Sequence, residues 1–170
     1  LAALVDDIGE SAHLAVLHGR DVLYLVEERA PRRPALVTDV GVRLPSHVTA
    51  SGRALLATLP PAQVRALFPD RAAFATRVEG GVQSYGELKR LLEGARRQGF
   101  AAEDGDVTAE IASVAVAVRD HAGWPAASIA VTFERRRLPP EEWPALADRI
   151  RPHAADLSRR IRGTVDATTG

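Results

Sequence analysis

The strongest candidate for chemistry in this sequence is a run of small residues, Ala50-Ser51-Gly52, at the predicted start of a helix. Thr49 or Ser51 can cap this helix with its hydroxyl, and apolar residues follow at helical spacing. Because the three residues have little or no side chain, several first-turn N–H groups are left uncovered, which suits a small anion. An ordinary capped helix, with small residues for packing, is the alternative interpretation.

Small polar residues also interrupt two apolar segments that are predicted to be strands. Ser113 lies in the first segment, and Ser128 and Thr132 lie in the second. Ser128, Ala130 and Thr132 share one face of their strand by its two-residue period. Buried hydroxyls need partners, so this wall of small side chains either bonds to the rest of the protein or faces a polar ligand.

Most enzyme and metal motifs are missing from the sequence. It has no nucleophile elbow, no phosphate-binding loop, no dinucleotide-binding glycine pattern and no His-Glu-x-x-His motif. The five histidines lack the spacing of metal ligands. A triad of Ser51 or Ser113 with His47 and Asp104 can be assembled on paper, but any chain of this length offers such triples. We therefore predict no enzymatic activity, no metal and no cofactor.

The elements that position these residues follow from apolar periodicity and turn residues, and together they predict an α+β fold. A helix over 1–10 precedes a hairpin over 11–26, and an irregular arm leads to the helix that begins near Thr49. The remaining expected elements are a short strand at 36–37, a helix over 62–68, a helical turn at 72–74, a helix over 84–99, a strand over 100–102, an acidic turn over 103–106, a hairpin of strands over 111–118 and 126–133, and a long helix from 138 that Pro152 kinks or splits.

The composition is that of one globular domain, with 46% hydrophobic and 26% charged residues in 170. Lys plus Arg equals Asp plus Glu, 22 each, so no overall attraction to nucleic acid or membrane is predicted. The chain has no cysteine, which excludes disulfides and thiol nucleophiles and fits a cytoplasmic location. No apolar run approaches the length of a membrane span, and the first residues lack a signal-peptide pattern.

The stretch from Gly41 to Ala57 resembles a known signature. It is similar to the Gly-x-x-Leu-Pro-x-His-x-[Ser/Thr]-x-x-Gly-[Lys/Arg]-x-x-Leu-Ala run in the effector-binding domain of IclR-type bacterial transcriptional regulators. The matching positions are Gly41, Leu44, Pro45, His47, Thr49, Gly52, Arg53, Leu56 and Ala57. The segment Gly99-Phe100-Ala101-Ala102-Glu103-Asp104 resembles a second family motif, Gly-[Tyr/Phe]-x-x-[Asp/Glu]-[Asp/Glu].

The resemblance implies a GAF-like α+β domain over residues 1–163, with a central antiparallel sheet flanked by helices and a disordered tail over 164–170. The helix-turn-helix domain of such regulators is expected to lie outside this chain. The implied partners are a small carboxylic or aromatic acid, a second copy in a homodimer or tetramer, and DNA only through that other domain, with no membrane contact. Two alternatives stay open: a GAF-like or PAS-like sensor of another signalling protein, and a small hydrolase or isomerase that uses His47 with an acidic partner.

The resemblance also implies roles for particular residues. The backbone of Ala50 and Ser51, beside Thr49, would bind the carboxylate of the effector, and Glu103 would accept a hydrogen bond from a ligand hydroxyl or hydrate. The side wall of the pocket would be formed by Ser113, Ala130 and Thr132. The sequence departs from the family pattern where Ala130 replaces a serine and Phe133-Glu134 replaces Gly-Pro. These departures favour an effector that is less polar than glyoxylate or pyruvate.

Overall fold

A single antiparallel sheet forms the centre of the molecule, in a computed structural model that describes residues 1–31, 33, 40–74 and 81–162. Its six strands follow the order β3-β2-β1-β6-β5-β4. The strands are β1 Ser11–His18, β2 Asp21–Glu28, β3 Arg43–Pro45, β4 Ala101–Asp104, β5 Ile111–Arg119 and β6 Pro125–Glu134. The β1–β2 and β5–β6 hairpins are joined by pairing of β1 with β6, so strands from near the two ends of the chain lie side by side.

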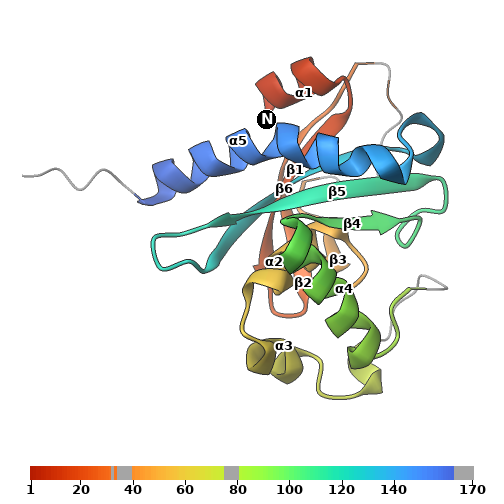
Figure 1. Cartoon of the computed structure of the whole chain (residues 1–170), viewed down its shortest axis with the longest axis vertical. Helices are drawn as coiled ribbons and strands as arrows, with labels where there is room; N and C mark the ends of the chain where they lie inside the picture. Colours follow the sequence, from red (N-terminus) through yellow and green to blue (C-terminus); the bar gives the residue numbers. More distant parts are fainter. Residues whose placement is uncertain (32, 34–39, 75–80, 163–170) are drawn as a thin grey trace, which may run out of the picture.

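Helices cover both faces of this sheet and give three layers (Figure 1). On one face, α5 packs on β5 and β6 and α1 packs on α5 and β1. On the other face, α2 contacts β4, β5, β6 and β1, and α4 packs on α2 and β4. The helices are α1 Ala2–Ile8, α2 Ala50–Thr58, α3 Pro61–Leu67, α4 Tyr85–Gln98 and α5 Trp143–Arg162, with short 3-10 turns at Arg71–Phe74, Arg135–Arg137 and Pro140–Glu142.

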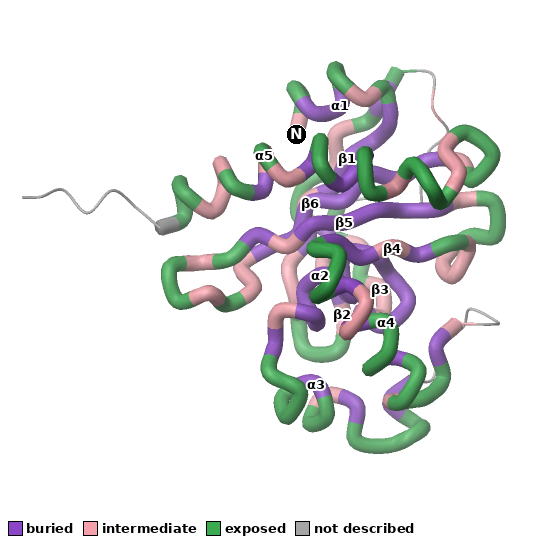
Figure 2. Tube along the Cα trace, viewed as in Figure 1, coloured by how far each residue is buried: buried purple, intermediate pink, exposed green. Residues whose placement is uncertain are grey.

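Each helical layer encloses its own apolar core. Under α1 and α5 the core contains large aliphatic side chains of the sheet, including Val114, Ile129 and Val131. Under α2 and α4 the sheet instead contributes small residues, Ala101, Ala115 and Ala130. The buried part of the chain trace is concentrated in the sheet and α2 (Figure 2). The alternation of a strand therefore divides the sheet into a large-residue face and a small-residue face, and α2 lies on the second.

Most of the predicted elements are present. The α+β fold and the two hairpins are confirmed, and α2 begins at Ala50 with Thr49 as its N-cap. The helix over 84–99 is confirmed as α4, with Ser84 as N-cap and Gly99 ending the helix at φ 77°. This φ lies in the left-handed region that glycine adopts without strain.

Three expectations were wrong in detail. The residues Glu103 and Asp104 belong to strand β4 and not to an acidic turn, because β4 pairs with β5 up to Asp104. The arm before α2 is not wholly irregular, since Arg43–Pro45 pairs with β2. The long helix α5 starts at Trp143 and not at 138, because a 3-10 turn occupies the residues before it, and Pro152 lies inside α5 without splitting it.

Some expectations fall where the chain is not described. The strand at 36–37 and the tail over 164–170 lie outside the described residues, as does the expected domain end at 163. Among the helices that are described, none is long and apolar enough to cross a membrane.

Candidate functional site

The start of α2 is held tightly by the segment that precedes it. The Thr49 hydroxyl accepts a hydrogen bond from the Gly52 amide at 3.0 Å and so caps the helix. A Cβ at position 52 would overlap the backbone of Ser46, which lies against the first turn. Only glycine fits here, so Gly52 allows the arm to fold back over the helix start.

Several polar groups at this helix start are buried without partners. Among the described residues, the amides of Ala50 and Ser51 donate no hydrogen bond, and the buried Ser51 hydroxyl has no partner within hydrogen-bonding geometry. Both residues are only 1% exposed. Buried donors of this kind are costly unless something accepts their hydrogen bonds. The first turn of this nine-residue helix therefore has free donors for an anion or a polar ligand.

The residues predicted to form a wall lie together on the sheet opposite α2. Glu103, Ser113 and Thr132 lie opposite one another on β4, β5 and β6. The Ser113 hydroxyl donates to Glu103 Oε1 at 3.0 Å, and Ser113 Oγ lies 3.0 Å from Thr132 Oγ1. Ala130 is two residues further along β6, in the same apolar cluster as Ala50 of α2. The structure thus brings the predicted strand residues together and places them on the α2 side of the sheet.

Glu103 is a buried acid with few compensating charges. It is 3% exposed, and its Oε2 accepts a hydrogen bond from the Asp106 amide at 3.0 Å. Burial raises its pKa from 4.5 to about 7; hydrogen bonds from Ser113 and Asp106 oppose the shift, the Asp106 carboxylate adds to it, and Arg53 lowers it. The side chain can therefore exchange a proton near neutral pH.

Tyr24 is a neighbour of this site that the sequence analysis missed. It lies on β2, is 4% exposed, and packs against Leu55 of α2. Burial raises its pKa, the nearby Ser51 hydroxyl opposes this, the Glu103 charge raises it further, and the Thr49 hydroxyl lowers it. The titration of Tyr24 is therefore influenced by both the helix start and Glu103. Its position in an alternating strand was the only available signal.

Arg53 connects the helix start to the end of β4. The sequence did not indicate this structural role. Its guanidinium donates to the carbonyl oxygens of His47 and Ala102 at 2.9 Å each and to Asp106 Oδ2 at 2.5 Å. The guanidinium group is therefore hydrogen-bonded to acceptors within the protein. A ligand carboxylate at the helix start would be held by amides and hydroxyls, without a free arginine.

A second buried polar pair lies on the same face of the sheet. His13 on β1 lies opposite Ala130 of β6 and Glu27 of β2, and its Nε2 is 3.6 Å from Glu27 Oε1. Burial and, secondarily, the charge of Arg29 lower the pKa of His13 to about 4, so the imidazole is neutral at pH 7. Sequence reasoning missed this pair because both faces of β1 are apolar in pattern.

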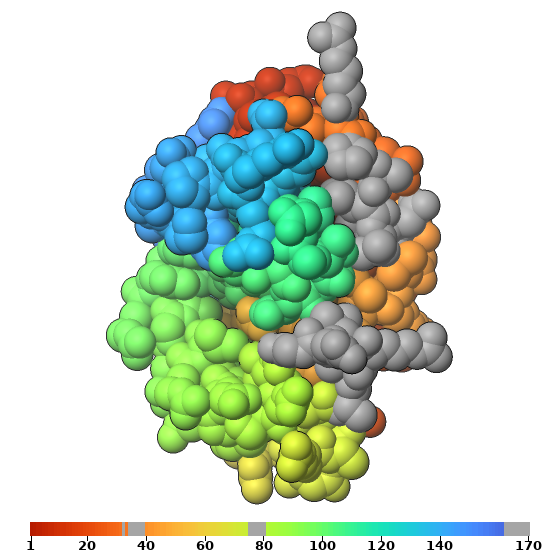
Figure 3. Space-filling model, turned by 90° about the vertical axis from the view of Figure 1, so that its right-hand side faces the viewer, coloured from red at the N-terminus to blue at the C-terminus, as the bar shows by residue number. Residues whose placement is uncertain are grey.

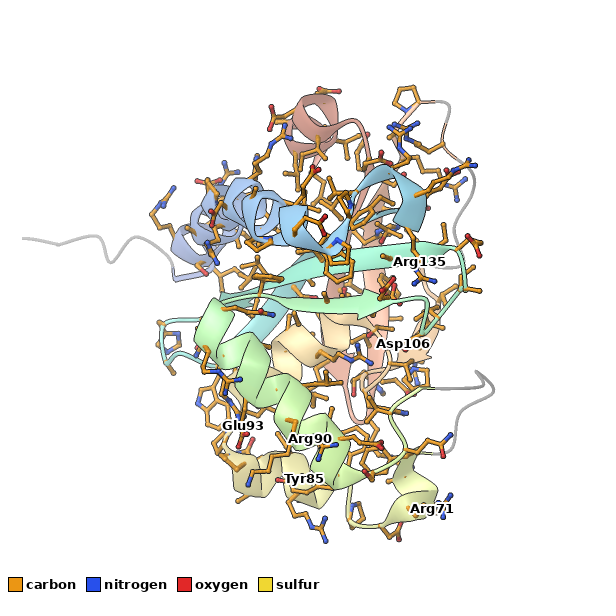
Figure 4. All side chains as sticks on the ribbon, turned by 45° about the vertical axis from the view of Figure 1, so that its right-hand side comes forward. Arg71, Tyr85, Arg90, Glu93, Asp106 and Arg135 are labelled. Atoms are coloured by element: carbon orange, nitrogen blue, oxygen red, sulfur yellow. The ribbon has the colours of Figure 1, made fainter. Side chains whose placement is uncertain are left out.

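An open groove with a volume of about 710 Å³ lies between α4, β4 and the start of α5, and it reaches Arg53 and Glu103 of the candidate site. Figure 3 shows this side of the molecule, with α4 below, the start of α5 above and the turn after β4 between them. Among the predicted ligand-binding residues, only Glu103 lines it. Asp106 and Arg135 lie at the end of the sheet, apart from the labelled side chains of α4 (Figure 4).

The serine–histidine arrangement is not formed. The rings of Phe68 and Phe74 pack edge-on against His47 with centroids 5.5 and 5.4 Å away, and neither nitrogen of His47 has a partner within hydrogen-bonding geometry among the described residues. Burial is the main cause that lowers the pKa of His47. Asp104 pairs with Arg135 at 2.5 Å, on the other side of β4. Likewise, the described part of the chain contains no group of three side chains that could hold a metal ion.

Comparison with known proteins agrees with this architecture. The family described as "Bacterial transcriptional regulator IclR C-terminal" matches residues 1–159. The glycerol operon regulatory protein of Streptomyces coelicolor is 33% identical over 155 residues, which are 90% of this chain and 60% of that protein. The chain therefore spans 60% of the length of this relative, slightly less than two thirds.

Solved structures show the same fold. The IclR of Thermotoga maritima superimposes with a TM-score of 0.88 at 23% identity, covering 96% of this chain and 66% of that one. An IclR homologue from Microbacterium hydrocarbonoxydans, complexed with 4-hydroxybenzoate, superimposes with a TM-score of 0.81 at 24% identity, covering 94% of this chain and 64% of that one. The curated relatives are named as regulators and repressors, in agreement with the prediction that the chain is not an enzyme. The chain belongs to the family of bacterial IclR-type transcriptional regulators and corresponds to their C-terminal domain.

Proposed function

We propose that this domain binds a small organic acid between the start of α2 and the wall formed by β4, β5 and β6. The observation that carries the proposal is the set of buried donors at the helix start: the amides of Ala50 and Ser51 have no acceptor among the described residues, and the Ser51 hydroxyl has only the Tyr24 hydroxyl near it. These donors suit a carboxylate, and the helix dipole favours its charge.

The rest of the ligand would lie against small and polar side chains. Ala130 presents only a small methyl group on β6, while Ser113 and Thr132 offer hydroxyls and Glu103 offers a carboxyl group. Thr49 borders the carboxylate end, although its oxygen already accepts from Gly52. An aromatic acid suits this arrangement, with its carboxylate between the helix start and the wall hydroxyls and its ring against the small apolar side chains. In support, a structural relative of the same fold is bound to 4-hydroxybenzoate.

In the whole protein, effector binding would change how two copies are arranged, as a homodimer or tetramer, and so place the DNA-binding domains differently. We assign DNA contact to a separate N-terminal helix-turn-helix domain, and we expect the present chain alone not to retain DNA at physiological salt. Such coupling requires the ligand to favour one arrangement by about 1–3 kcal/mol. Because regulators of this kind act on DNA, we place the protein in the cytoplasm.

A thermal-shift screen against carboxylic and aromatic acids tests the proposal. A ligand present at about one hundred times its dissociation constant should stabilise the chain by about 2.7 kcal/mol. Ala130→Val adds two methyl groups to the wall and should abolish the shift. Ala127→Val is the matched control, because it adds the same methyl groups on the opposite face of β6, where Ala127 belongs to the other core.

Both valine variants should lose some stability from overpacking, about 1–3 kcal/mol. Circular dichroism therefore has to show that each is folded before binding is compared. Equal ligand shifts in Ala130→Val and the wild type would remove the site from this face of the sheet.

A further inference from the structure

The hydrogen bonds of Glu103, Ser113 and Thr132 form a chain whose direction is not fixed by the positions of the heavy atoms. The Ser113 hydroxyl oxygen lies 3.0 Å from Glu103 Oε1 and 3.0 Å from Thr132 Oγ1, and either hydroxyl can donate in the second contact. Each hydroxyl has a single hydrogen to donate. The direction of one bond therefore determines the direction of the other.

With Glu103 ionised, the chain must run towards the carboxylate. Ser113 donates its only hydrogen to Glu103, so it must accept from Thr132. The hydrogen of Thr132 is then used, and its oxygen offers only lone pairs to a ligand. In this state the wall accepts hydrogen bonds, which suits a ligand with an N–H or O–H group.

With Glu103 protonated, the chain runs in the opposite direction. The Asp106 amide donates to Oε2 at 3.0 Å, so that oxygen must remain an acceptor and the proton is directed to Oε1. Glu103 then donates to Ser113, Ser113 donates to Thr132, and the hydrogen of Thr132 becomes free for a ligand. In this state the wall can donate to a carboxylate oxygen.

We propose that protonation of Glu103 reverses this chain and so decides whether the site takes an organic anion or a neutral hydrogen-bond donor. The proposal rests on the ligand site proposed above and specifies its ligand class. Repulsion between a ligand carboxylate and an ionised Glu103 acts in the same direction, since both effects favour the protonated acid when an anion binds.

The groups around Glu103 permit this exchange near neutral pH. Burial raises its pKa to about 7. Arg53 of α2 faces Glu103 but is already paired with Asp106. The un-ionised Tyr24 of β2 interacts electrostatically with the Glu103 charge. The neutral His13 lies one strand further away, on β1 beside β6. No described cation is left free to hold Glu103 permanently ionised.

Benzoate and its neutral analogue benzamide are suitable probes, titrated into the 170-residue chain by calorimetry at pH 6, 7 and 8. If only the protonated form binds the anion, the apparent dissociation constant rises as the competent fraction falls, so benzoate should bind about tenfold more weakly at pH 8 than at pH 6. Benzamide should not lose affinity over this range. Benzoate is itself fully ionised throughout, so its own titration does not contribute.

Two variants separate the hydrogen-bond chain from simple repulsion. Glu103→Gln carries an amide that donates to Ser113 and accepts from Asp106, so it should bind benzoate with the wild-type pH 6 affinity at every pH. Thr132→Val removes the terminal hydroxyl but leaves the charge of Glu103. If benzoate binding to Thr132→Val retains the full tenfold pH dependence, repulsion alone is responsible and the proposal is overturned.

A measurement without ligand keeps the test independent of the proposed function. In methyl-labelled protein, the Thr132 signal should titrate with the midpoint of Glu103, and this titration should vanish in both Glu103→Gln and Ser113→Ala. A Thr132 titration that persists in Ser113→Ala overturns the proposal, because that variant breaks the chain. Loss of the titration together with no benzoate binding at any pH supports the chain and refutes the proposed ligand site.

Discussion

Nη2 of Arg53 lies 2.5 Å from Oδ2 of Asp106, so the first turn of α2 is bonded to the turn that follows β4. The same guanidinium also donates to the carbonyl oxygens of His47 and Ala102. One side chain thereby joins the arm, the helix and the edge strand around the candidate site.

Arg53→Ala should be strongly destabilising. It removes three hydrogen bonds from a side chain that is 5% exposed and leaves Asp106 without its charge partner. Breaking a buried pair costs about 3–5 kcal/mol, and we expect the lower end because Asp106 is partly exposed. The stability of Arg53→Lys should lie between those of the wild type and Arg53→Ala, since an ammonium group cannot reach all three acceptors.

Urea unfolding measures the effect, with Lys89→Ala as control. Lys89 pairs with Glu93 at 3.8 Å on the exposed side of α4, and losing such a pair costs about 0.5 kcal/mol or less. Comparable losses in Arg53→Ala and Lys89→Ala would contradict the structural role assigned to Arg53.

Gly52→Ala should also destabilise the chain, because the new methyl group would overlap the backbone of Ser46. Backbone cannot move aside as a flexible side chain does, so a loss of about 3 kcal/mol or more is expected. Gly94→Ala is the matched control: its methyl group would meet only the end of Arg97, at 3.9 Å, within helix α4. There, alanine should stabilise by up to about 1 kcal/mol. Changes of the same sign in both variants would show that Ser46 does not restrict position 52.

Arg96 and its neighbour Arg97 should differ sharply in chemical denaturation. Arg96 donates to the carbonyl oxygens of Ala57 and Leu59, which belong to the end of α2. Arg96→Ala leaves these carbonyls without that partner and should cost about 1–2 kcal/mol. Arg97 is exposed and makes no such bond, so Arg97→Ala should change stability by less than about 0.5 kcal/mol. Equal effects would mean that Arg96 does not hold α2.

The pH dependence of stability should contain two opposing contributions. The pKa of Glu103 is raised from 4.5 to about 7 by burial, so the folded chain holds a proton that the unfolded chain releases, and stability is lost as pH rises from about 4.5 to 7. The pKa of His13 is lowered from 6.5 to about 4, chiefly by burial, so stability is lost as pH falls from 6.5 to 4. Each contribution is on the order of 3 kcal/mol, and the two largely cancel between pH 4.5 and 6.5.

Single variants should expose each contribution. Relative to the wild type, the stability of Glu103→Gln should rise as pH increases from 4.5 to 7, because the contribution of the acid is removed. Relative to the wild type, the stability of His13→Gln should fall as pH increases from 4 to 6.5, because the contribution of this histidine is removed while that of His47 is retained. Urea unfolding at half-unit pH steps measures both slopes, and a wild-type profile in both variants would contradict the two shifts.

Local sequence signals predicted the fold well, because most elements carry their own boundaries. Helix ends are marked by capping hydroxyls at Thr49 and Ser84 and by the backbone freedom of Gly99. In the structure Thr49 and Ser84 are the N-caps of α2 and α4, and Gly99 ends α4. The signal failed at Glu103 and Asp104, where a composition typical of a turn is overridden by pairing with β5. Pairing between distant strands leaves no local mark, so the contact of β1 with β6 was not predicted.

The candidate site could be predicted in part. Ser113 and Thr132 stood out because they interrupt apolar strands, and the structure joins them to Glu103. Arg53 did not stand out, since nothing in the sequence shows that its partners lie on β4 and the turn after it. Tyr24 was hidden for another reason: an aromatic residue in an apolar strand has the pattern of ordinary core. The ligand-binding roles themselves remain predictions.

The pairing of β1 with β6 also has a consequence for how the chain folds. During synthesis β1 and β2 are made before β3, β4 and β5, but β6, the neighbour of β1 in the finished sheet, is made after all of them. Until then one edge of the first hairpin has no strand beside it. The apolar core under α1 and α5 also lacks the side chains that β6 contributes to it. Long-range pairing of this kind slows folding, because a large loop must close before its contacts form. The nascent domain therefore has an unpaired sheet edge until β6 has been synthesised. Aggregation is most favoured during this interval.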